Sequence, residues 1–462
     1  MDNALLDRII KAYDIRGLVD EEITPDFTFA LGIAFANFLE VEREPARVVV
    51  GEDMRPSSPD LAQAFSDGIT SQGLDVVRIG LSSTDQLYFA SGHLNLPGAM
   101  FTASHNPAAY NGIKLCRSGA RPIGQESGLR WIRNKIASGS PLPQRPVGKE
   151  SHREMLSDYV DYLFSLFPSD AFSQSFNNRQ LVIAIDAGNG MGGHTAPAVM
   201  SRINAEIHGI YFDLDGTFPN HEANPIDPKN LVDLQKLVKK KGADIGLAFD
   251  GDADRCFIVD ENGELVTPSA LTALIAKREL SKNPGSSVIY NLISSKAVPE
   301  VIIECGGVPL RSRVGHSFIK QMMADNQAIF GGEHSGHFYF KDFWRADSGM
   351  LAALHAIAAL LEDGRSLSTL LQPFNRYFLS GEINTKVNDQ QGALAAIRSH
   401  FAASTEGCEF DDLDGLTVSA SKWWFNVRPS NTEPLLRLNV EAHDQRLLDE
   451  KTSQVLAIIN NQ

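Results

Sequence analysis

The stretch RVVVG at residues 47–51 decides the fold class of this chain. Its continuous β-branched run is typical of a buried strand. The apolar residues of 59–72 then recur at helical spacing, Gly73 ends that helix, and residues 74–79 form a second strand. A strand, a helix and a strand in this order predict a βαβ unit, and therefore an α/β domain.

The same order of elements recurs twice further along the chain. Residues 181–185 form a strand, a glycine-rich loop follows, and a helix over 194–204 leads to a strand over 207–212. Residues 287–290 and 308–310 form a third pair of strands, with a helix between them. These recurrences predict three similar mixed α/β domains built on one plan.

The pattern changes after Pro373. Strands are expected over 383–387, 423–427 and 435–440, with helices over 392–401 and 446–459. This mixture predicts a smaller C-terminal α+β domain with an antiparallel sheet. The expected domains are residues 1–150, 151–259, 260–372 and 373–462.

The composition limits the classes of partner. The chain has 462 residues, 43% of them apolar and 21% charged, and a net charge of −15. Such a negative charge disfavours duplex nucleic acid and anionic membranes, because neither would be attracted to the protein. A small anionic substrate remains possible where a few Lys and Arg residues gather in one cleft.

The cysteines and the apolar segments indicate the cellular compartment of the protein. None of the four cysteines has a CxxC spacing, so we expect reduced thiols and a cytoplasmic protein. The first residues lack a basic region followed by an apolar run, so no secretory signal is expected. No stretch reaches eighteen continuous apolar residues, and the short apolar segment 350–361 predicts a buried core helix.

The sequence TASHNP at residues 102–107 follows an apolar run that ends at Phe101. A strand that stops on a small hydroxyl residue, in a turn held by Asn and Pro, presents that hydroxyl at the surface of the fold. A single turn serine commonly only caps the backbone. Whether Ser104 has a functional role therefore has to be judged together with the other polar loops of the chain.

The sequence DGDADR at residues 250–255 places Asp250, Asp252 and Asp254 at i, i+2 and i+4 between two strands. Three hard oxygen ligands on one loop favour Mg²⁺ or Ca²⁺ over Zn²⁺. An EF-hand loop is rejected, because Arg255 stands at its sixth position in place of glycine and strands replace its helices. Solvated turn acids are the other alternative.

The sequence GEHSGH at residues 332–337 precedes an aromatic run. Glu333 and Ser335, two residues apart on a loop, can bond neighbouring hydroxyls of a sugar. A zinc site of His334, His337 and His316 is the weaker interpretation, because these histidines have no carboxylate or thiolate partner in the sequence.

The sequence RPSNTEP at residues 428–434 joins two predicted antiparallel strands. It gathers a guanidinium, two hydroxyls, an amide and several backbone N–H groups, which together suit a dianionic phosphate. The alternative is an ordinary polar hairpin turn, which would need neither the Arg nor both hydroxyls.

A glycine loop supports a different class of function. Gly188, Gly190 and Gly193 match GxGxxG between a strand and a helix, and Asp213 follows about twenty residues on. This pattern would suit an NAD-dependent oxidoreductase, whereas a tight β–α turn needs glycines for packing alone. A metal-dependent phosphatase that uses the aspartate loop is a third hypothesis.

Five stretches, taken together and in order, resemble the α-D-phosphohexomutase family, most closely its bacterial phosphomannomutase/phosphoglucomutase branch. They are KAYDIRG at 11–17, TASHNP at 102–107, DGDADR at 250–255, GEHSGH at 332–337 and RPSNTEP at 428–434. The resemblance covers the whole chain. It implies four domains around a central cleft, with one loop from each domain at the cleft.

The resemblance also implies an activity and its ligands. The enzyme would interconvert hexose 6-phosphate and hexose 1-phosphate of mannose, glucose or both, through a phosphoserine and a bisphosphorylated sugar. Mg²⁺ would be the metal, and hexose 1,6-bisphosphate would be the intermediate and activator. The partners would be small sugar phosphates only, and the protein would be a monomer.

Site residues follow from the motif positions. The resemblance implies that Ser104 carries the phosphoryl group and that Mg²⁺ is held by Ser104, Asp250, Asp252 and Asp254. The residues implied at the reacting centre are Arg16, Ser104, Lys114, Arg255 and His316. Those implied to bind substrate are Tyr13, Arg16, Lys296, Glu333, Ser335, His337, Arg428, Ser430, Asn431 and Thr432. Lys114 and His316 are both candidates for the general base, which would need a lowered pKa.

One residue departs from the pattern of the branch. His334 stands where the branch usually has Met, so the preference for one sugar over another is left open. KAYDIRG favours the mannose and glucose enzymes over the amino-sugar enzymes, and phosphoglucosamine mutase activity is kept as the alternative.

Overall fold

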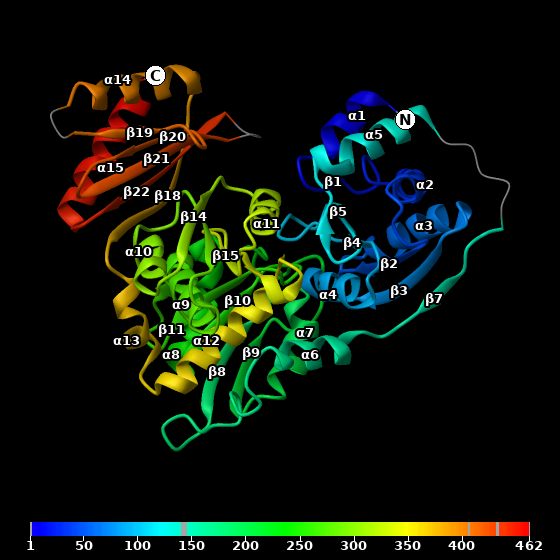
Figure 1. Ribbon diagram of the computed structural model, residues 1–462, viewed down its shortest axis with the longest axis horizontal. Helices are drawn as coiled ribbons and strands as arrows, with labels where there is room; N and C mark the ends of the chain where they lie inside the picture. The colour runs from blue at the N-terminus through cyan, green and yellow to red at the C-terminus, as the bar shows by residue number, and fades with distance from the viewer. Residues whose placement is uncertain (1, 140–145, 405–406, 431–433, 462) are drawn as a thin grey trace.

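Four β-sheets follow one another along the chain (Figure 1). The computed structural model describes residues 2–139, 146–404, 407–430 and 434–461. The first three sheets mix parallel and antiparallel strands, and the fourth is antiparallel throughout. The prediction of three similar mixed α/β units followed by a smaller α+β domain is confirmed.

The first sheet has the strand order β1-β5-β4-β2-β3-β7, with β6 added to β5. Its elements are α1 (Asn3–Ile9), β1 (Ile15–Leu18), α2 (Pro25–Val41), β2 (Arg47–Glu52), α3 (Ser58–Ser71), β3 (Asp75–Leu81), α4 (Thr84–Leu94), β4 (Gly98–Phe101), β5 (Tyr110–Arg117), β6 (Arg121–Pro122), α5 (Arg130–Ser138) and β7 (Glu150–His152). The predicted βαβ unit is β2-α3-β3, and its two strands are parallel. Val48, Val49 and Val50 are fully buried, as the β-branched run predicts.

The second sheet has the order β12-β11-β10-β8-β9. Its elements are α6 (Leu156–Ser165), β8 (Leu181–Asp186), α7 (Gly192–Met200), β9 (Ala205–Ile210), α8 (Val232–Lys241), β10 (Ile245–Phe249), β11 (Cys256–Asp260) and β12 (Leu265–Val266). The helix after β8 ends earlier than the predicted 194–204, because parallel pairing of β9 with β8 already begins at Ala205 and Leu181.

The third sheet has the order β14-β13-β15-β16-β17. Its elements are α9 (Pro268–Lys282), β13 (Ser287–Asn291), α10 (Ala297–Glu304), β14 (Val308–Ser312), α11 (His316–Asp325), β15 (Phe330–Gly332), β16 (Phe338–Phe340), β17 (Ala346–Asp347), α12 (Gly349–Asp363) and α13 (Leu367–Leu371). The apolar segment 350–361 lies in α12 and is buried, as expected of a core helix.

The C-terminal domain has the order β18-β22-β21-β20-β19. Its elements are β18 (Phe378–Lys386), α14 (Gln390–Ala402), β19 (Glu409–Asp411), β20 (Leu416–Ser419), β21 (Trp423–Pro429), β22 (Leu435–Ala442) and α15 (Gln445–Ile459). In Figure 1 this domain, orange to red, stands apart from the first sheet, and the second and third sheets lie below both.

The first three sheets share one topology. In each, a central strand (β2, β8 or β13) lies between two parallel neighbours, and the neighbour that comes later in the chain pairs with an antiparallel strand. The fifth position is filled by β12 and β17 in the second and third sheets, but by the N-terminal β1 in the first. The repeated plan places corresponding loops at corresponding edges.

Two strands cross the boundaries expected from the sequence. β7 pairs with β3, so the first sheet extends past residue 150. β12 pairs with β11, so the second sheet extends past residue 259. Both short strands add hydrogen bonds to a sheet edge, which the local sequence pattern does not reveal. In the described part of the chain, no helix combines the length and the apolar character needed to cross a membrane.

Candidate active site

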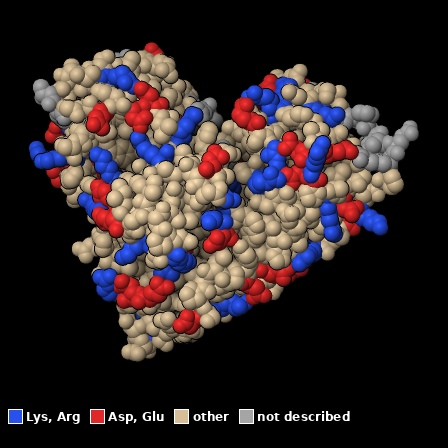
Figure 2. Space-filling model, viewed as in Figure 1, with Lys and Arg blue, Asp and Glu red and all other residues tan. Residues whose placement is uncertain are grey.

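Three predicted functional loops occupy the same position in the three related sheets. Residues 102–109 join β4 to β5, residues 250–255 join β10 to β11, and residues 333–337 join β15 to β16. Each loop therefore connects the third parallel strand to its antiparallel neighbour. Figure 2 shows a deep notch between the C-terminal domain and the first sheet, with lysine and arginine side chains among those on its walls.

The first two loops contact each other closely. A Cβ atom on Gly251 would collide with the carbonyl oxygen of Ser104, so only glycine permits this approach. The aspartate loop also contacts the third loop, because Arg255 and His337 form an isolated antiparallel bridge. The three loops thus converge, although each belongs to a different sheet.

Ser104 lies at the centre of this contact. Its φ angle of 51° places it in the left-handed region, which non-glycine residues rarely adopt. The Thr102 hydroxyl accepts a hydrogen bond of 2.9 Å from the Ser104 backbone N–H. The Ser104 Oγ donates to Asp250 Oδ2 at 2.8 Å and lies 3.1 Å from His105 Nδ1. The turn therefore directs the serine oxygen at the aspartate loop.

Asp250, Asp252 and Asp254 are buried, and one carboxylate oxygen from each lies within 4.8 Å of the others. Burial, followed by repulsion from Asp252 and Asp254, raises the pKa of the Asp250 carboxyl well above its usual range. Among the described residues, Asp252 Oδ1 has no hydrogen-bond partner. A buried cluster of carboxylates with an unsatisfied oxygen fits a hard divalent cation, and the neighbouring Ser104 oxygen fits the same ligand set.

Lys114, on β5, links two of these carboxylates. Its Nζ donates to Asp252 Oδ2 at 2.7 Å and to Asp254 Oδ2 at 2.6 Å. Burial disfavours the ammonium, but Asp252 and Asp254 outweigh it and raise the pKa of Lys114 well above its ordinary value. Burial likewise opposes ionisation of Asp254, but Lys114, then His337 and Arg255, hold the pKa of Asp254 well below its usual range.

Two arginines complete the positive surroundings of Ser104. Arg16, on β1, donates to the Asn106 side chain and, at 3.3 Å, to the Ala103 carbonyl. Arg255 Nε lies 3.5 Å from Asp250 Oδ2 and donates to His337 Nε2 at 3.3 Å. Both guanidinium groups lie next to the loop that carries Ser104, so together with Lys114 they can neutralise an anionic group there.

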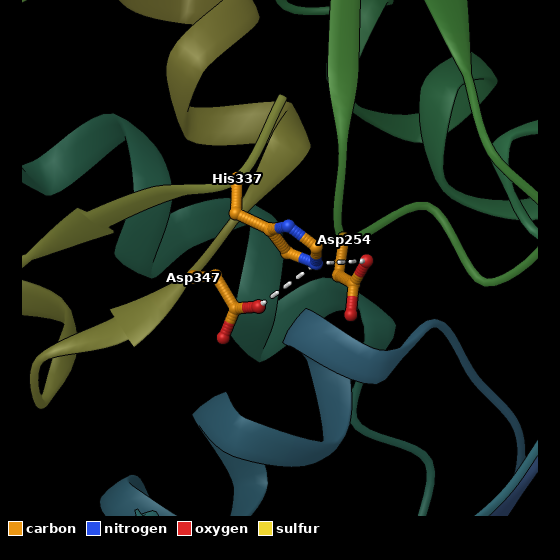
Figure 3. Close-up of side chains that lie close together, drawn as sticks. All are labelled: Asp254, His337 and Asp347. Carbon is orange, nitrogen blue, oxygen red and sulfur yellow. Dashed lines mark ion pairs between the residues drawn. The ribbon is translucent and has the colours of Figure 1, made fainter. Parts of the chain in front are cut away.

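His337 lies between two buried carboxylates (Figure 3). Its Nε2 is 3.5 Å from Asp254 Oδ1 and 3.7 Å from Asp347 Oδ2. Asp347 in turn pairs with the buried Lys320 at 2.6 Å. Carboxylates of the aspartate loop and of β17 therefore flank His337 and hold it between the second and third sheets.

The third loop presents its polar groups next to the N-terminal motif. Glu333 accepts hydrogen bonds from the Gly315 N–H at 3.0 Å and from the Tyr339 hydroxyl at 2.6 Å. The Ser335 Oγ and His337 Nδ1 are 2.9 Å apart. Tyr13 packs edge-on against Phe318, near the start of α11, with ring centroids 6.4 Å apart. Tyr13, Glu333 and Ser335 are thus brought to one region.

The fourth loop follows β21. Arg428 Nη2 donates to Glu382 Oε2 at 2.7 Å, and the same carboxylate accepts from Arg437 Nη1 at 3.1 Å. The Ser430 N–H donates to the Leu435 carbonyl at 2.9 Å. Asn431 and Thr432 lie outside the described residues, as does the side chain of His316.

The fourth loop lies near the third loop. Burial lowers the pKa of His334, and its charged neighbours are Glu382 and Arg428 of the C-terminal domain. Lys296 lies elsewhere on this domain boundary: its N–H donates to Glu441 at 3.0 Å and its Nζ to the Ala420 carbonyl at 3.4 Å. Lys296 therefore contacts the C-terminal domain rather than the Ser104 loop.

The glycine loop that suggested a dinucleotide site is used in packing. A Cβ atom on Gly190 would lie 2.6 Å from the Gly251 carbonyl oxygen, and one on Gly193 would collide with the Phe212 carbonyl. The Met191 N–H donates to the Gly251 carbonyl at 2.9 Å. The loop therefore supports the aspartate loop, which explains its glycines without a nucleotide.

Three residues of the site were missed by sequence reasoning. Thr84, at the N-terminus of α4, donates to Asp252 Oδ2 at 2.5 Å. Arg55 holds the loop that carries Ser104, and Glu382 pairs with Arg428. Arg55 and Thr84 lie in polar segments just after β2 and β3, and such strand ends are a signal for functional residues in α/β folds. Glu382 stands inside a strand, where no local pattern marks it.

Comparison with known proteins covers the chain in four segments. The four domains of phosphoglucomutase/phosphomannomutase match in order: alpha/beta/alpha domain I at residues 7–142, domain II at 157–263, domain III at 267–377 and the C-terminal domain at 382–457. The matches together include all four loops described above.

Individual relatives align with this chain over nearly its whole length. A phosphomannomutase of Salmonella montevideo is 38% identical over 461 residues, which are 98% of each chain. A phosphohexose mutase of Xanthomonas campestris pv. campestris is 38% identical and covers 96% of this chain and 97% of its own. A crystal structure of a phosphoglucomutase/phosphomannomutase family protein from Burkholderia thailandensis superposes with a TM-score of 0.87 at 28% identity, covering 100% of this chain and 98% of its own.

Proposed function

The chain belongs to the phosphoglucomutase/phosphomannomutase family, and from this premise we propose that it interconverts hexose 6-phosphates and hexose 1-phosphates. The sugars are mannose, glucose or both, and the reaction passes through a phosphorylated Ser104 and a bisphosphorylated sugar. The observation that carries the proposal is the buried Ser104 Oγ, 2.8 Å from Asp250 and surrounded by Lys114, Arg16 and Arg255.

The metal ligands in this proposal are Asp250, Asp252 and Asp254, with an oxygen of the phosphorylated Ser104. When bound, Mg²⁺ would act as a Lewis acid that withdraws charge from the phosphoryl oxygens. The three carboxylates are buried together, and burial, followed by repulsion from Asp252 and Asp254, raises the pKa of Asp250, so a bound cation would stabilise its ionised form.

The transfer itself exchanges one P–O bond for another. The bond between the Ser104 oxygen and phosphorus breaks, a bond from the sugar hydroxyl oxygen to phosphorus forms, and the hydroxyl proton leaves to a base. Lys114, Arg255 and Arg16 disperse the negative charge on the transferring group. The raised pKa of Lys114 favours this electrostatic role over that of general base, so His316 is kept as the candidate base.

The bisphosphorylated intermediate then returns its other phosphate to Ser104, which requires it to turn end for end. Glu333, Ser335 and His337 hold the sugar hydroxyls, while Arg428, Ser430, Asn431 and Thr432 hold the phosphate that is not reacting. Tyr13 and Lys296 also bind substrate in this proposal. The hydrogen bond from the Lys296 N–H to Glu441 supports a role for Lys296 at the boundary of the C-terminal domain.

Four domains, one for each loop, are part of the proposal. The proposed boundaries follow His152 and Val266, where the first and second sheets end, in place of residues 150 and 259, and the third stays near residue 372. The enzyme is proposed to act as a monomer in the cytoplasm, with hexose 1,6-bisphosphate as its activator.

The test is turnover of mannose 1-phosphate, glucose 1-phosphate and glucosamine 1-phosphate side by side. Mannose and glucose differ only at C2, and Glu333 and Ser335 need not sense that difference, so both should be converted with comparable kcat/KM. A preference beyond about a thousandfold, roughly 4 kcal/mol, would reveal a C2 contact. Steady release of inorganic phosphate without a product sugar phosphate would refute the mutase in favour of a phosphatase.

A further inference from the structure

Arg55 is buried beneath the loop that carries Ser104. Its side chain is 1% exposed, and its guanidinium donates to three backbone carbonyl oxygens of that loop and to the carbonyl of Tyr110, the first residue of β5. The distances are 2.9 Å to Ser104, 2.7 Å to Asn106, 3.0 Å to Pro107 and 2.9 Å to Tyr110. Most of this loop lies outside the regular ladder of the sheet, so these bonds replace the ones that secondary structure would provide.

The other sides of the guanidinium are also occupied. Asp53 Oδ2 lies 3.3 Å from Arg55 Nε, and the ring of Phe218 covers the guanidinium with its centroid 5.1 Å away. Phe218 belongs to the second sheet's loop after β9, and Gly216 of the same loop approaches so closely that a Cβ there would lie 2.7 Å from the Arg55 Cα. Arg55 is therefore enclosed between the first and second sheets.

We propose that Arg55 is a positioning residue for phosphoryl transfer, and that Phe218 holds its guanidinium in place. The inference rests on the proposed function and identifies what keeps the Ser104 oxygen on the aspartate loop despite a left-handed backbone. Only a planar fork of N–H donors can reach four converging carbonyls from one point. A lysine in this position has three donors and no fixed plane, so it cannot satisfy all four.

The first experiment compares Arg55→Lys with Arg78→Lys. Arg78 is the matched control, because it is also a buried arginine of the first sheet, but it binds Glu52 and Gln63 away from Ser104. Both variants lose a buried guanidinium. We expect kcat per folded molecule to fall roughly tenfold to a hundredfold in Arg55→Lys, as for a reacting atom misplaced by about 1 Å. KM for the hexose phosphate should stay within about twofold, since no described residue of the sugar or phosphate loops forms a hydrogen bond with the side chain of Arg55.

A second readout does not depend on turnover. Amide hydrogen exchange of a peptide that spans residues 102–110 should become faster in Arg55→Lys and stay at the wild-type rate in Arg78→Lys. Equal losses of kcat in both variants, or wild-type kcat and exchange in Arg55→Lys, would overturn the positioning role. If instead the wild type converts no hexose phosphate, the proposed function fails, while the exchange experiment still decides whether Arg55 holds the loop.

Phe218→Leu keeps the test decisive where Arg55→Lys does not fold. Phe218 is only partly buried, and leucine retains an apolar side chain there, so this variant should fold. A severalfold lower kcat at unchanged KM supports the proposal, because the guanidinium loses the ring that covers it. Wild-type kcat in Phe218→Leu would contradict it.

Discussion

The loop that carries Ser104 and the loop that follows Arg428 are tied to the molecule in different ways. Ser104 is 1% exposed and lies where the first and second sheets meet, with Gly251 against its carbonyl. One hydrophobic cluster, with members from Val49 to Phe374, includes residues of all three related sheets, and each of these units has a further cluster of its own. The proposed reacting centre is therefore built into a single packed body.

The C-terminal domain has a hydrophobic cluster of its own, from Val387 to Ile459. Its contacts with the third sheet include polar ones: Arg311 Nη2 donates to Thr417 at 3.2 Å, and the Val314 N–H donates to Asp414 at 3.2 Å. The partner of Arg428, Glu382, belongs to the same domain. The loop proposed to bind phosphate is thus attached to a separate body, with polar groups at the boundary.

This difference matches two demands of the proposed reaction. Phosphoryl transfer needs its reacting atoms held within fractions of an ångström, which a continuous packed core provides. The grip on the distant phosphate has to form and release while the intermediate turns, and part-buried polar contacts such as those of Arg311 and Val314 can be exchanged for contacts with water at a lower cost than an apolar core can be opened. We therefore expect the C-terminal domain to move as a unit on the other three.

The largest loss of activity should come from a substitution in the packed body, at Ser104. Ser104→Ala removes the only proposed phosphoryl carrier, so kcat should fall at least about a thousandfold while the protein folds normally. Ser66→Ala is the control, because Ser66 is also buried in the first unit but bonds only the Ala62 carbonyl. Digestion and mass analysis of the wild type should place phosphate on the peptide that holds Ser104, and a label on another residue would contradict the assignment.

The metal site comes next. Asp252→Asn removes a charge from the buried carboxylate cluster, so Mg²⁺ affinity and kcat should each fall, with roughly a tenfold to hundredfold loss in affinity. Asp85→Asn is a matched control, because Asp85 is buried nearby but bonds Tyr159 and Ser348. Calorimetric titration with Mg²⁺ measures the affinity, and full activity after treatment with EDTA would rule out the metal.

A smaller effect on catalysis is expected from substitutions in the C-terminal domain. Arg428→Ala should raise KM about tenfold to a hundredfold, the value of a charge-assisted hydrogen-bonded pair, and Arg428→Lys should raise it less. Phosphorylated Ser104 should stay detectable in both, and the requirement for added bisphosphate should rise because the intermediate escapes more often. Arg398→Lys is the control, since Arg398 forms an exposed pair with Asp412 in the same domain. Wild-type KM and activator dependence in Arg428→Ala would exclude this loop as the phosphate clamp.

The last prediction concerns the stability of the packed body, and no loss of activity is expected to be its readout. Asp85 joins three units through hydrogen bonds from Ser83, Tyr159 and Ser348, and burial raises its pKa from 3.8 to about 6. Between these pKa values the folded protein binds a proton that the unfolded chain does not, so this contribution to stability is present in acid and is lost as pH rises through about 6.

Asp85→Asn cannot titrate, so its free energy of unfolding relative to the wild type should increase from about pH 4 to about pH 7, by up to about 3 kcal/mol. Denaturant titrations across this range measure the difference. A pH-independent difference between the two proteins would show that Asp85 ionises normally within the fold.

Much of the fold was predictable from the sequence, because strands and helices depend on local patterns. The β-branched run that contains Val49 and the apolar segment in α12 form the elements that their spacing predicts. Short edge strands such as β7 and β12 were missed, because two or three residues carry no pattern and their pairing comes from neighbours far away in the chain.

For the site, the sequence by itself determined which loops are candidates for the reactive chemistry, because the three aspartates, Ser104 and Arg428 stand in short runs of unusual composition. Tertiary structure alone decided how these groups meet. Lys114 binds Asp252, which is 138 residues away in the sequence. Arg55 lies beneath Ser104, and Glu382 accepts a hydrogen bond from the guanidinium of Arg428. Spacing along a loop is a local property, whereas the contacts between loops depend on how separate sheets pack, and that packing is the sum of many burial terms that no single stretch contains.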